Sequence, residues 1–519
     1  MRTIKIYDTT LRDGTQAEGV SLSLLDKIAI TKKLDEIGIH YIEGGWPGSN
    51  PKDIAYFKEV QKLKLKNSLI AAFGSTHRAS VKVEEEQNMR ALIEANTPVI
   101  TIFGKTWDLH VRVVLRISDD KNLEIIHNSV KFLKKKKKEV IYDAEHFFDG
   151  YKTNPEYALK TLGAALEGGA DWLVLCDTNG GTLVGELQKI VREVRKTFDC
   201  KLGIHTHNDS GVGVANAIAA IDEGCNQVQG TINGIGERCG NANLCSIVPN
   251  IKLKLKLNCL TSPQLKKLYD LSHYVNELAN LIPDERQPYI GASAFAHKGG
   301  MHVNAVEKDA ATFEHIPPEL VGNKRRILLS ELAGKSNVIL IARQLGIELK
   351  DNDKVYKDVL KRIKELENEG YEFEGAEASF KLLVKKAMGK YKPLFRSAGF
   401  RVVVEKKEDG CLISEATVKI IIKDKEILMT AEGDGPVNAL DTALRKALRG
   451  HYPEISKVHL KDYKVRVLDA KEGTAAKVRV HIESGDQHDN WNTVGVSENI
   501  IEASWWALVD SIEYKLLKD

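Results

Sequence analysis

The sequence lacks the features that mark membrane-spanning, secreted and nucleic-acid-binding proteins. No apolar run approaches the roughly 20 residues that span a bilayer, and the seven cysteines among 519 residues form no Cys-x-x-Cys pair. The N-terminus begins on a predicted strand instead of a signal peptide. Because 75 basic residues are balanced by 72 acidic ones, the charge gives no reason to expect a nucleic-acid partner. These absences predict a reduced, cytoplasmic protein with no membrane or nucleic-acid partner.

A glycine-rich phosphate turn is also missing after the first predicted strand, where residues 8–14 read Asp-Thr-Thr-Leu-Arg-Asp-Gly. An open doubly wound sheet would need such a turn at that point. The sequence has instead a regular alternation of short strand-like runs and longer amphipathic stretches. Eight strands are predicted before about residue 250, at residues 4–8, 41–45, 69–73, 99–103, 140–145, 172–177, 202–207 and 227–232. Eight β-α units of this size indicate an α/β TIM barrel, whose active site lies at the C-terminal ends of the strands.

The seventh predicted strand carries His205 and His207. Two residues apart on a strand, both imidazoles point to the same face. Neutral imidazole is the commonest protein ligand for a divalent metal, although a hydrogen-bonded core pair would show the same spacing. Polar residues at the ends of other strands favour a shared site, among them Arg12, Asp13, Glu43, Lys105, Glu145, Asp177, Thr178, Glu237, Arg238 and Asn241.

The pattern changes beyond the barrel, and we predict three domains: a catalytic barrel at residues 1–265, helical linker and lid subdomains at 266–390, and a C-terminal domain at 391–519. The glycine- and alanine-rich residues 291–302 are either a loop with structural glycines or a lid that contributes a histidine. The C-terminal domain repeats one pattern of three strands and a helix, over residues 400–448 and again from residue 464. Two βββα units indicate an internally duplicated α+β domain. Because it has no catalytic constellation, we expect it to bind a small molecule or to dimerise.

Three motifs carry a family resemblance: Asp8-Thr-Thr-Leu-Arg-Asp-Gly-Thr-Gln16, His205-x-His207-Asn208 and Asn233-Gly-Ile-Gly-Glu-Arg-Cys-Gly-Asn241. Together they resemble the signature of the metal-dependent aldolase-like TIM barrels. That superfamily includes 2-isopropylmalate synthase, homocitrate synthase, citramalate synthase and hydroxymethylglutaryl-CoA lyase. The tail resembles the regulatory dimer domain of the isopropylmalate and citramalate synthases. Residues 41–51, 72–77 and 143–150 are similar to the longer citramalate synthase branch, so the resemblance covers essentially the whole chain.

The resemblance implies an acyltransferase that condenses pyruvate with acetyl-CoA and water to give (R)-citramalate and CoA, on a route to isoleucine. It implies a divalent metal ion, Zn²⁺, Mn²⁺ or Mg²⁺, because two imidazoles and a carboxylate suit zinc while waters could complete a manganese or magnesium site. Acetyl-CoA would be the co-substrate. The duplicated tail would form a homodimer and carry feedback inhibition by an amino-acid effector, isoleucine.

Carried over by motif, the metal ligands would be Asp13, His205 and His207 with Asn241 as a fourth, the catalytic residues Arg12, Glu145 and His302, and the substrate-binding residues Arg12 and Thr178. In these roles Arg12 would hold the polarised keto oxygen and Thr178 the substrate carboxylate. Glu145 would be the acid–base group. His302 would reach the site from the segment after the barrel.

Some alternatives stay open. Asp143 has the same strand parity as Glu145, so either carboxyl could be the base. Phe313 stands where synthases of this group usually carry tyrosine, so any role of a phenolic hydroxyl there is either lost or supplied by another group. A 2-isopropylmalate synthase, which takes 2-ketoisovalerate in leucine biosynthesis, would differ only in pocket size. A non-catalytic metabolite sensor is the alternative from another class, although the intact motif residues argue against it.

Overall fold

The computed structural model describes residues 2–297, 302, 305–306, 308–327, 354–373, 375–387, 391–468, 475–486 and 489–518. Contacts divide the chain into two compact units. The first consists of Met1–Phe295 with Ile316–Arg325, and the second of Ala296–His315 with Arg326–Asp519. The predicted three-domain division at residues 265 and 390 stays a prediction.

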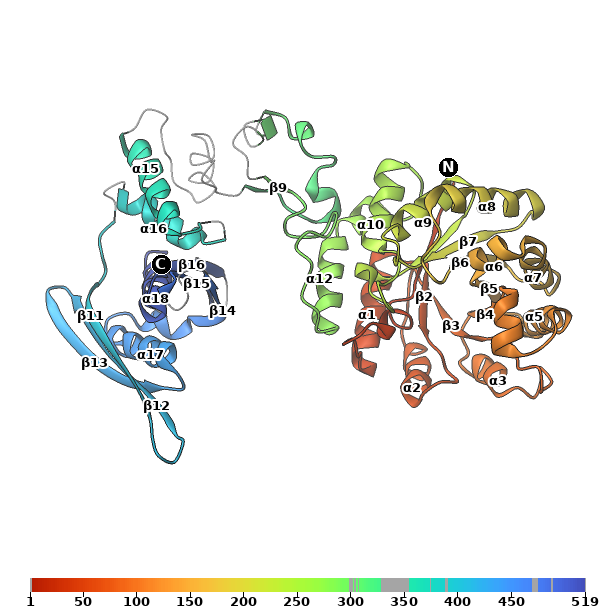
Figure 1. Cartoon of the computed structure of the whole chain (residues 1–519), viewed down its shortest axis with the longest axis horizontal. Helices are drawn as coiled ribbons and strands as arrows, with labels where there is room; N and C mark the ends of the chain where they lie inside the picture. The colour runs from red at the N-terminus through yellow and green to blue at the C-terminus, as the bar shows by residue number, and fades with distance from the viewer. Residues whose placement is uncertain are drawn as a thin grey trace. The chain divides into compact units, whose positions relative to one another are not determined.

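The first unit contains a closed barrel of eight parallel strands in sequence order, which confirms the predicted TIM barrel (Figure 1). The strands are β1 Lys5–Asp8, β2 Tyr41–Gly45, β3 Leu69–Ser75, β4 Val99–Lys105, β5 Glu139–Glu145, β6 Trp172–Asp177, β7 Leu202–Thr206 and β8 Gln227–Gly230. The ring closes where β1 pairs with β8, with Tyr7 beside Gln229. The strands are mostly buried on both faces, as expected for parallel strands that are covered by helices on one side and packed against each other on the other.

Alternate strand residues serve different parts of the core. Outward-facing residues such as Ile6, Ile42 and Ile204 join the large cluster that also contains the helices. Inward-facing residues form a separate cluster of Tyr7, Tyr41, Ala71, Val99, Ile141, Trp172, Val174 and Cys176. The interior is therefore packed and leaves no pore, so a site for substrates lies at an end of the barrel.

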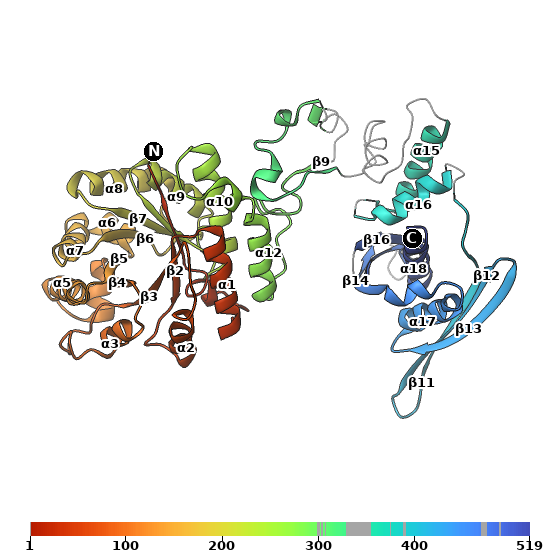
Figure 2. The same cartoon turned by 180° about the vertical axis from the view of Figure 1, so that it is seen from behind.

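Helices surround the barrel (Figures 1 and 2). They are α1 Leu24–Ile37, α2 Pro51–Val60, α3 Gln87–Glu94, α4 Asp108–His110, α5 Asp119–Lys135, α6 Phe147–Thr153, α7 Pro155–Glu167, α8 Val184–Thr197, α9 Gly213–Asp222, α10 Leu244–Pro249, α11 Ser262–Leu265 and α12 Leu268–Leu278. Ser23 and Asp26 form a capping box at the start of α1, and Gly38 ends that helix with a φ of 86°. Across the described residues, no helix combines the length and apolar character that a bilayer span requires.

The second unit contains two three-stranded antiparallel sheets, each followed by a helix, which confirms the predicted pair of βββα units. One consists of β11 Arg396–Lys406, β12 Leu412–Ile422, β13 Lys425–Gly433 and α17 Pro436–Arg449; the other of β14 His459–Val467, β15 Val478–Gly485, β16 Asn490–Ser497 and α18 Ile500–Leu516. Before them come the short parallel pair β9 Ala296–His297 and β10 Arg326–Ile327, and the helices α15 Lys354–Glu369 and α16 Glu377–Ala387. Ser379 on α16 donates to Asp510 on α18 at 2.7 Å, which fixes α16 to the second repeat.

His40 links three strands at the N-terminal end of the barrel. The Ile6 backbone N–H donates to its Nδ1 at 3.1 Å, and its carbonyl accepts from the Leu69 N–H at 2.9 Å. Burial, reinforced by Lys5, lowers the pKa of His40 to about 4. The His40 ring therefore stays neutral in the folded state down to about pH 4, whereas in the unfolded chain it takes up a proton below about pH 6.5.

We expect His40 to cost the fold about 2 kcal/mol of unfolding free energy as the pH falls from 7 to 5. In His40→Asn, the side-chain oxygen can still accept from Ile6 but cannot be protonated. Urea unfolding at pH 7 and pH 5 should show a smaller loss of unfolding free energy in this variant than in the wild type. His127→Asn, on α5, is the matched control. An equal acid loss in His40→Asn and the wild type would contradict the assignment.

Candidate active site and metal centre

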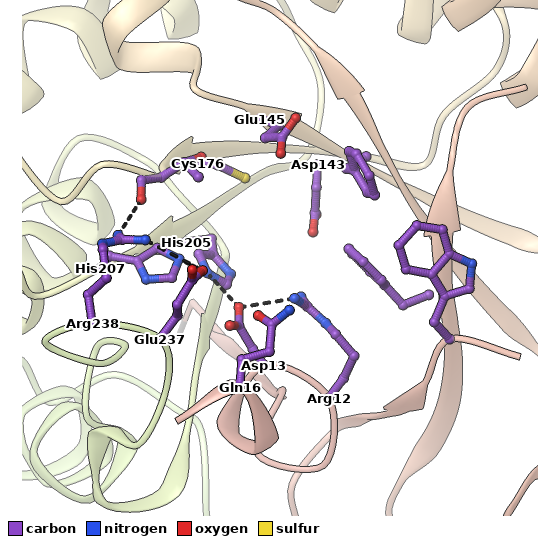
Figure 3. A pocket seen from close by; sticks show the side chains of 14 residues that line it. Arg12, Asp13, Gln16, Asp143, Glu145, Cys176, His205, His207, Glu237 and Arg238 are labelled. Atoms are coloured by element: carbon purple, nitrogen blue, oxygen red, sulfur yellow. Dashed lines mark hydrogen bonds and ion pairs between the residues drawn. The ribbon is translucent and has the colours of Figure 1, made fainter. Parts of the chain in front are cut away.

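The turn after β1 carries two of the predicted site residues. Asp8 ends the strand, and its carboxyl accepts hydrogen bonds from the Thr10 N–H at 3.0 Å and the Thr10 hydroxyl at 2.8 Å. The turn continues with the Asp13 N–H donating to the Thr9 carbonyl at 2.9 Å. This geometry directs Arg12 and Asp13 into one pocket at the C-terminal end of the barrel (Figure 3).

Asp13, His205 and His207 converge, and their potential ligand atoms all lie within 4.8 Å of one another. His205 Nε2 lies 3.5 Å from Asp13 Oδ2 and 3.4 Å from His207 Nε2. All three are buried, with exposures of 3%, 5% and 6%. The predicted strand ends one residue early, at Thr206, so His207 follows β7 and is held by a bridge to Asn241. The two imidazoles nevertheless meet, as the two-residue spacing predicts.

The electrostatics of this group suit a cation. Burial alone would raise the pKa of the Asp13 carboxyl, but Arg12 and the two imidazoles together hold it below its ordinary value. Burial, and next the neighbouring His205, lowers the pKa of His207 to about 4. At neutral pH the site therefore contains an ionised carboxylate and a neutral His207 ring, the protonation states that metal ligands require.

Two atoms are left over for a further ligand or a bound water. Within the described ranges, His207 Nδ1 and Asn241 Oδ1 are buried without a hydrogen-bond partner. The Asn241 side chain hydrogen-bonds Asp13, which places this amide beside the triad of Asp13, His205 and His207. Two nitrogen donors, a carboxylate and an amide oxygen fit a divalent ion of the zinc, manganese or magnesium group.

Arg12 is held at the edge of the triad by two carboxylates. Its Nη1 lies 3.2 Å from Asp13 Oδ2, and its Nε donates to Glu43 Oε1 at 2.5 Å. Glu43 is fully buried on β2 and also accepts from the Thr9 hydroxyl at 2.6 Å. The guanidinium carbon lies 3.8 Å from the centre of the Phe73 ring. Although burial acts to lower the pKa of Arg12, the two carboxylates raise it above its ordinary value, so the charge is permanent.

Of the eight residues with a predicted catalytic, substrate-binding or metal-binding role, six line one cavity of about 230 Å³: Arg12, Asp13, Glu145, Thr178, His205 and His207. Figure 3 shows Glu145 and Asp143 on the side opposite Arg12 and Asp13. The Lys105 ammonium forms an ion pair with Glu145. The Thr178 hydroxyl accepts from the His146 N–H at 2.9 Å, and its carbonyl accepts from Arg238 at 2.8 Å.

His302 lies in the second unit, outside the barrel. Its side chain is exposed and its ring stacks on Phe313, with ring centroids 4.2 Å apart. Phe313 therefore contacts the predicted catalytic histidine through its ring, the part it shares with tyrosine. The role of His302 in the site stays a prediction.

The cavity also has an aromatic wall that the sequence analysis missed. Trp46 packs edge-on against Phe73 and Phe103, at centroid distances of 5.9 Å and 5.8 Å, and the two phenylalanines stack at 5.5 Å. Phe73 and Phe103 have inward parity two residues before the ends of β3 and β4, and this parity was the available signal. Attention to polar residues alone passed over them.

Arg238 ties three loops together beside this cavity. Its guanidinium makes a bidentate pair with Asp209, at 2.8 Å and 2.9 Å, in addition to its bond to Thr178. Glu237 and Arg238 both line the cavity. They were predicted only as polar residues after strand eight, without a role.

Comparisons with known proteins agree with this architecture. Residues 3–275 match the HMGL-like family, residues 289–371 the homocitrate synthase post-HMGL domain-like family, and residues 374–516 the LeuA allosteric (dimerisation) domain. The chain is 59% identical to the (R)-citramalate synthase of Geobacter sulfurreducens over 519 residues, covering 100% of this chain and 98% of that one. It is 55% identical to the (R)-citramalate synthase of Aquifex aeolicus, covering 99% and 98%. The 2-isopropylmalate synthase of Methanocaldococcus jannaschii is 31% identical, covering 99% and 95%. The chain therefore belongs to the HMGL-like family and, within it, to the (R)-citramalate synthases.

Proposed function

We propose that this protein condenses pyruvate with acetyl-CoA and water to give (R)-citramalate and CoA, on a route to isoleucine. The convergence of Asp13, His205 and His207 beside Arg12, across one cavity from Glu145, is the observation that carries the proposal. The 59% identity to an (R)-citramalate synthase supports it. In the reaction, a bond forms between the acetyl methyl carbon and the keto carbon of pyruvate, and water then cleaves the thioester.

The acceptor half of the reaction belongs to the triad and Arg12. Asp13, His205 and His207, with Asn241, would hold a divalent cation, which when bound acts as a Lewis acid toward the keto acid. Arg12 adds a fixed positive charge for the oxygen that becomes an alkoxide. Glu43 holds the guanidinium in that position, and a preorganised donor of this kind is typically worth about 3 to 4 kcal/mol of barrier. Thr178, on the same cavity, would bind the substrate carboxylate.

The donor half needs a base for the acetyl methyl proton, and we assign it to Glu145. The Lys105 ammonium pairs with this carboxylate at the cavity wall. Burial, and next the charge of Glu43, raises the pKa of Asp143 to about 8, so at neutral pH Asp143 is mostly protonated, which favours Glu145 as the base. His302, from the segment after the barrel, would assist deprotonation or thioester hydrolysis.

The aromatic wall of Trp46, Phe73 and Phe103 suits a small acceptor. A methyl and an isopropyl group differ by about 1 to 3 kcal/mol in such a pocket. We therefore expect kcat/KM for pyruvate to exceed that for 2-ketoisovalerate by about 10- to 200-fold. Release of CoA with each keto acid and added metal ion measures both constants. Preference for the branched acid would make the protein a 2-isopropylmalate synthase, and no CoA release with any keto acid would support a non-catalytic sensor.

We also propose that the second unit forms a homodimer and carries feedback regulation by isoleucine. Residues 374–516 match the LeuA allosteric (dimerisation) domain, and none of the residues that we assign to catalysis or metal binding belongs to this stretch of the sequence. All seven cysteines, each within the described residues, are free thiols, which supports a reducing cytoplasmic location.

Isoleucine added to the full-length enzyme should raise the apparent KM or lower kcat, with a coupling of about 5- to 150-fold. The full chain is needed because Ser379 on α16 donates a hydrogen bond to Asp510 on α18. A truncation after residue 391 would remove α18 and leave α16 without this partner. Calorimetric titration with isoleucine, leucine and valine identifies the ligand, and light scattering gives the mass. If leucine alone bound, the effector would be leucine and not isoleucine. A monomeric mass would contradict the proposed homodimer.

A further inference from the structure

Three buried side chains form a hydrogen-bonded line that leads away from the triad. His205 Nδ1 lies 2.9 Å from Gln229 Oε1, and Gln229 Nε2 donates to Asp143 Oδ1 at 3.1 Å. The exposures of Asp143, Gln229 and His205 are 4%, 1% and 5%. The line crosses the barrel interior from β7 through β8 to β5. Figure 3 shows Asp143 and His205 facing the same cavity.

The direction of these bonds follows from the chemistry of the amide. Gln229 has donors only at its nitrogen and acceptors only at its oxygen. A protonated Asp143 still has one carboxyl oxygen that accepts, and Oδ1 takes this role toward the amide nitrogen at 3.1 Å, while Gln227 Oε1 accepts from the same nitrogen at 3.4 Å. The amide oxygen is thereby turned toward His205. An oxygen acceptor at that position requires the hydrogen of the ring to be on Nδ1.

The consequence falls on the other ring nitrogen. With the hydrogen on Nδ1, His205 Nε2 carries a lone pair, and Nε2 is the atom that faces Asp13 and His207. A reversed amide would donate to Nδ1 and leave the hydrogen on Nε2, pointing into the triad. Metal-binding histidines generally depend on such a partner at the second nitrogen.

We propose that Asp143 is a positioning residue that acts through Gln229 to fix His205 in the tautomer able to bind a cation. This inference rests on the proposed metal site. It gives Asp143 a function other than that of the catalytic base.

The test is the Zn²⁺ affinity of the metal-stripped, full-length protein, measured by competition with a chromophoric chelator. We expect Gln229→Leu to weaken binding by about 10- to 100-fold. Asp143→Leu should weaken it less, since Gln227 still attracts the amide nitrogen. Because Asp143 acts through Gln229, the double variant should bind no more weakly than Gln229→Leu. Asp143→Asn, whose amide oxygen can accept from Gln229, should restore most of the affinity lost in Asp143→Leu.

Tyr41→Phe is the matched control, because it removes a partly buried hydrogen bond to Glu139 at the other end of the barrel, at 2.9 Å, and Tyr41 makes no hydrogen bond to His205. Unchanged affinity in Gln229→Leu, or fully multiplicative losses in the double variant, would overturn the proposal. A wild-type protein that does not bind Zn²⁺ would instead reject the metal site itself.

A second measurement needs no substitution along the line. In protein labelled with ¹⁵N-histidine, the ring of His205 should show a protonated Nδ1 and an unprotonated Nε2 at neutral pH before metal is added. The spectrum of His205→Gln assigns the signal. A ring with its hydrogen on Nε2 would overturn the inference even if the leucine variants failed to fold.

Discussion

Replacing both His205 and His207 with alanine is expected to abolish stoichiometric binding of a divalent ion and to lower citramalate formation by about 10³-fold or more. The two rings supply two of the three converging ligands, and Asp13 alone cannot hold the ion against water. Arg12 would then be the remaining positive charge at the acceptor oxygen. Metal content by elemental analysis and CoA release with pyruvate, measured on the same preparation, test the two effects together.

His77→Ala is the control for metal content. His77 is also buried, at 7% exposure, but its ring hydrogen-bonds Ser129 on α5 at 2.9 Å and contributes nothing to the triad. This variant should keep the wild-type metal content, whereas each single replacement at the triad should reduce it. Normal turnover by the double variant would contradict the proposed reaction, because stabilisation of the alkoxide on the acceptor would then not require the metal ion.

The pairing of His205 and His207 could be predicted from the sequence because strand parity places both imidazoles on one face. Asp13 was assigned as the third ligand by the family resemblance, and the barrel brings the end of β1 near the end of β7 through β8. The positions of Glu145 and Thr178 at strand ends placed them at the cavity. Asn241 follows from the motif after β8, although its bridge to His207 needed the structure.

The supporting contacts could not be predicted in this way. Glu43 has inward parity on β2, but its bond to Arg12 depends on how the turn after β1 folds back. The Asp143–Gln229 pair joins β5 to β8, strands that are not neighbours in the barrel. Such contacts across the interior depend on strand tilt and stagger, which a pattern of alternating residues does not specify. The sequence thus identifies the groups that do chemistry more readily than those that hold them in place.

Glu145→Gln should lower kcat by about 10²- to 10⁴-fold, the range for loss of a general base. The amide keeps the size of the carboxylate but cannot accept the acetyl methyl proton, and it ends the ion pair with Lys105. Metal content should not change, because Glu145 is not part of the triad. The decisive measurement is the exchange of methyl deuterium from deuterated acetyl-CoA into water, which reports proton removal separately from carbon–carbon bond formation.

Strand β5 offers its own control for this test. Glu139 begins the same strand, at the opposite end of the barrel, where it accepts hydrogen bonds from Tyr41 at 2.9 Å and Trp172 at 3.0 Å. Glu139→Gln should therefore affect unfolding more than exchange. If Glu145→Gln retained wild-type exchange, the base would have to be another group at the cavity. Asp143, whose pKa burial raises to about 8, would then have to lose its proton first, and the rate of exchange would rise with pH toward 8. An exchange rate in the wild type that did not rise between pH 6 and pH 8 would argue against Asp143.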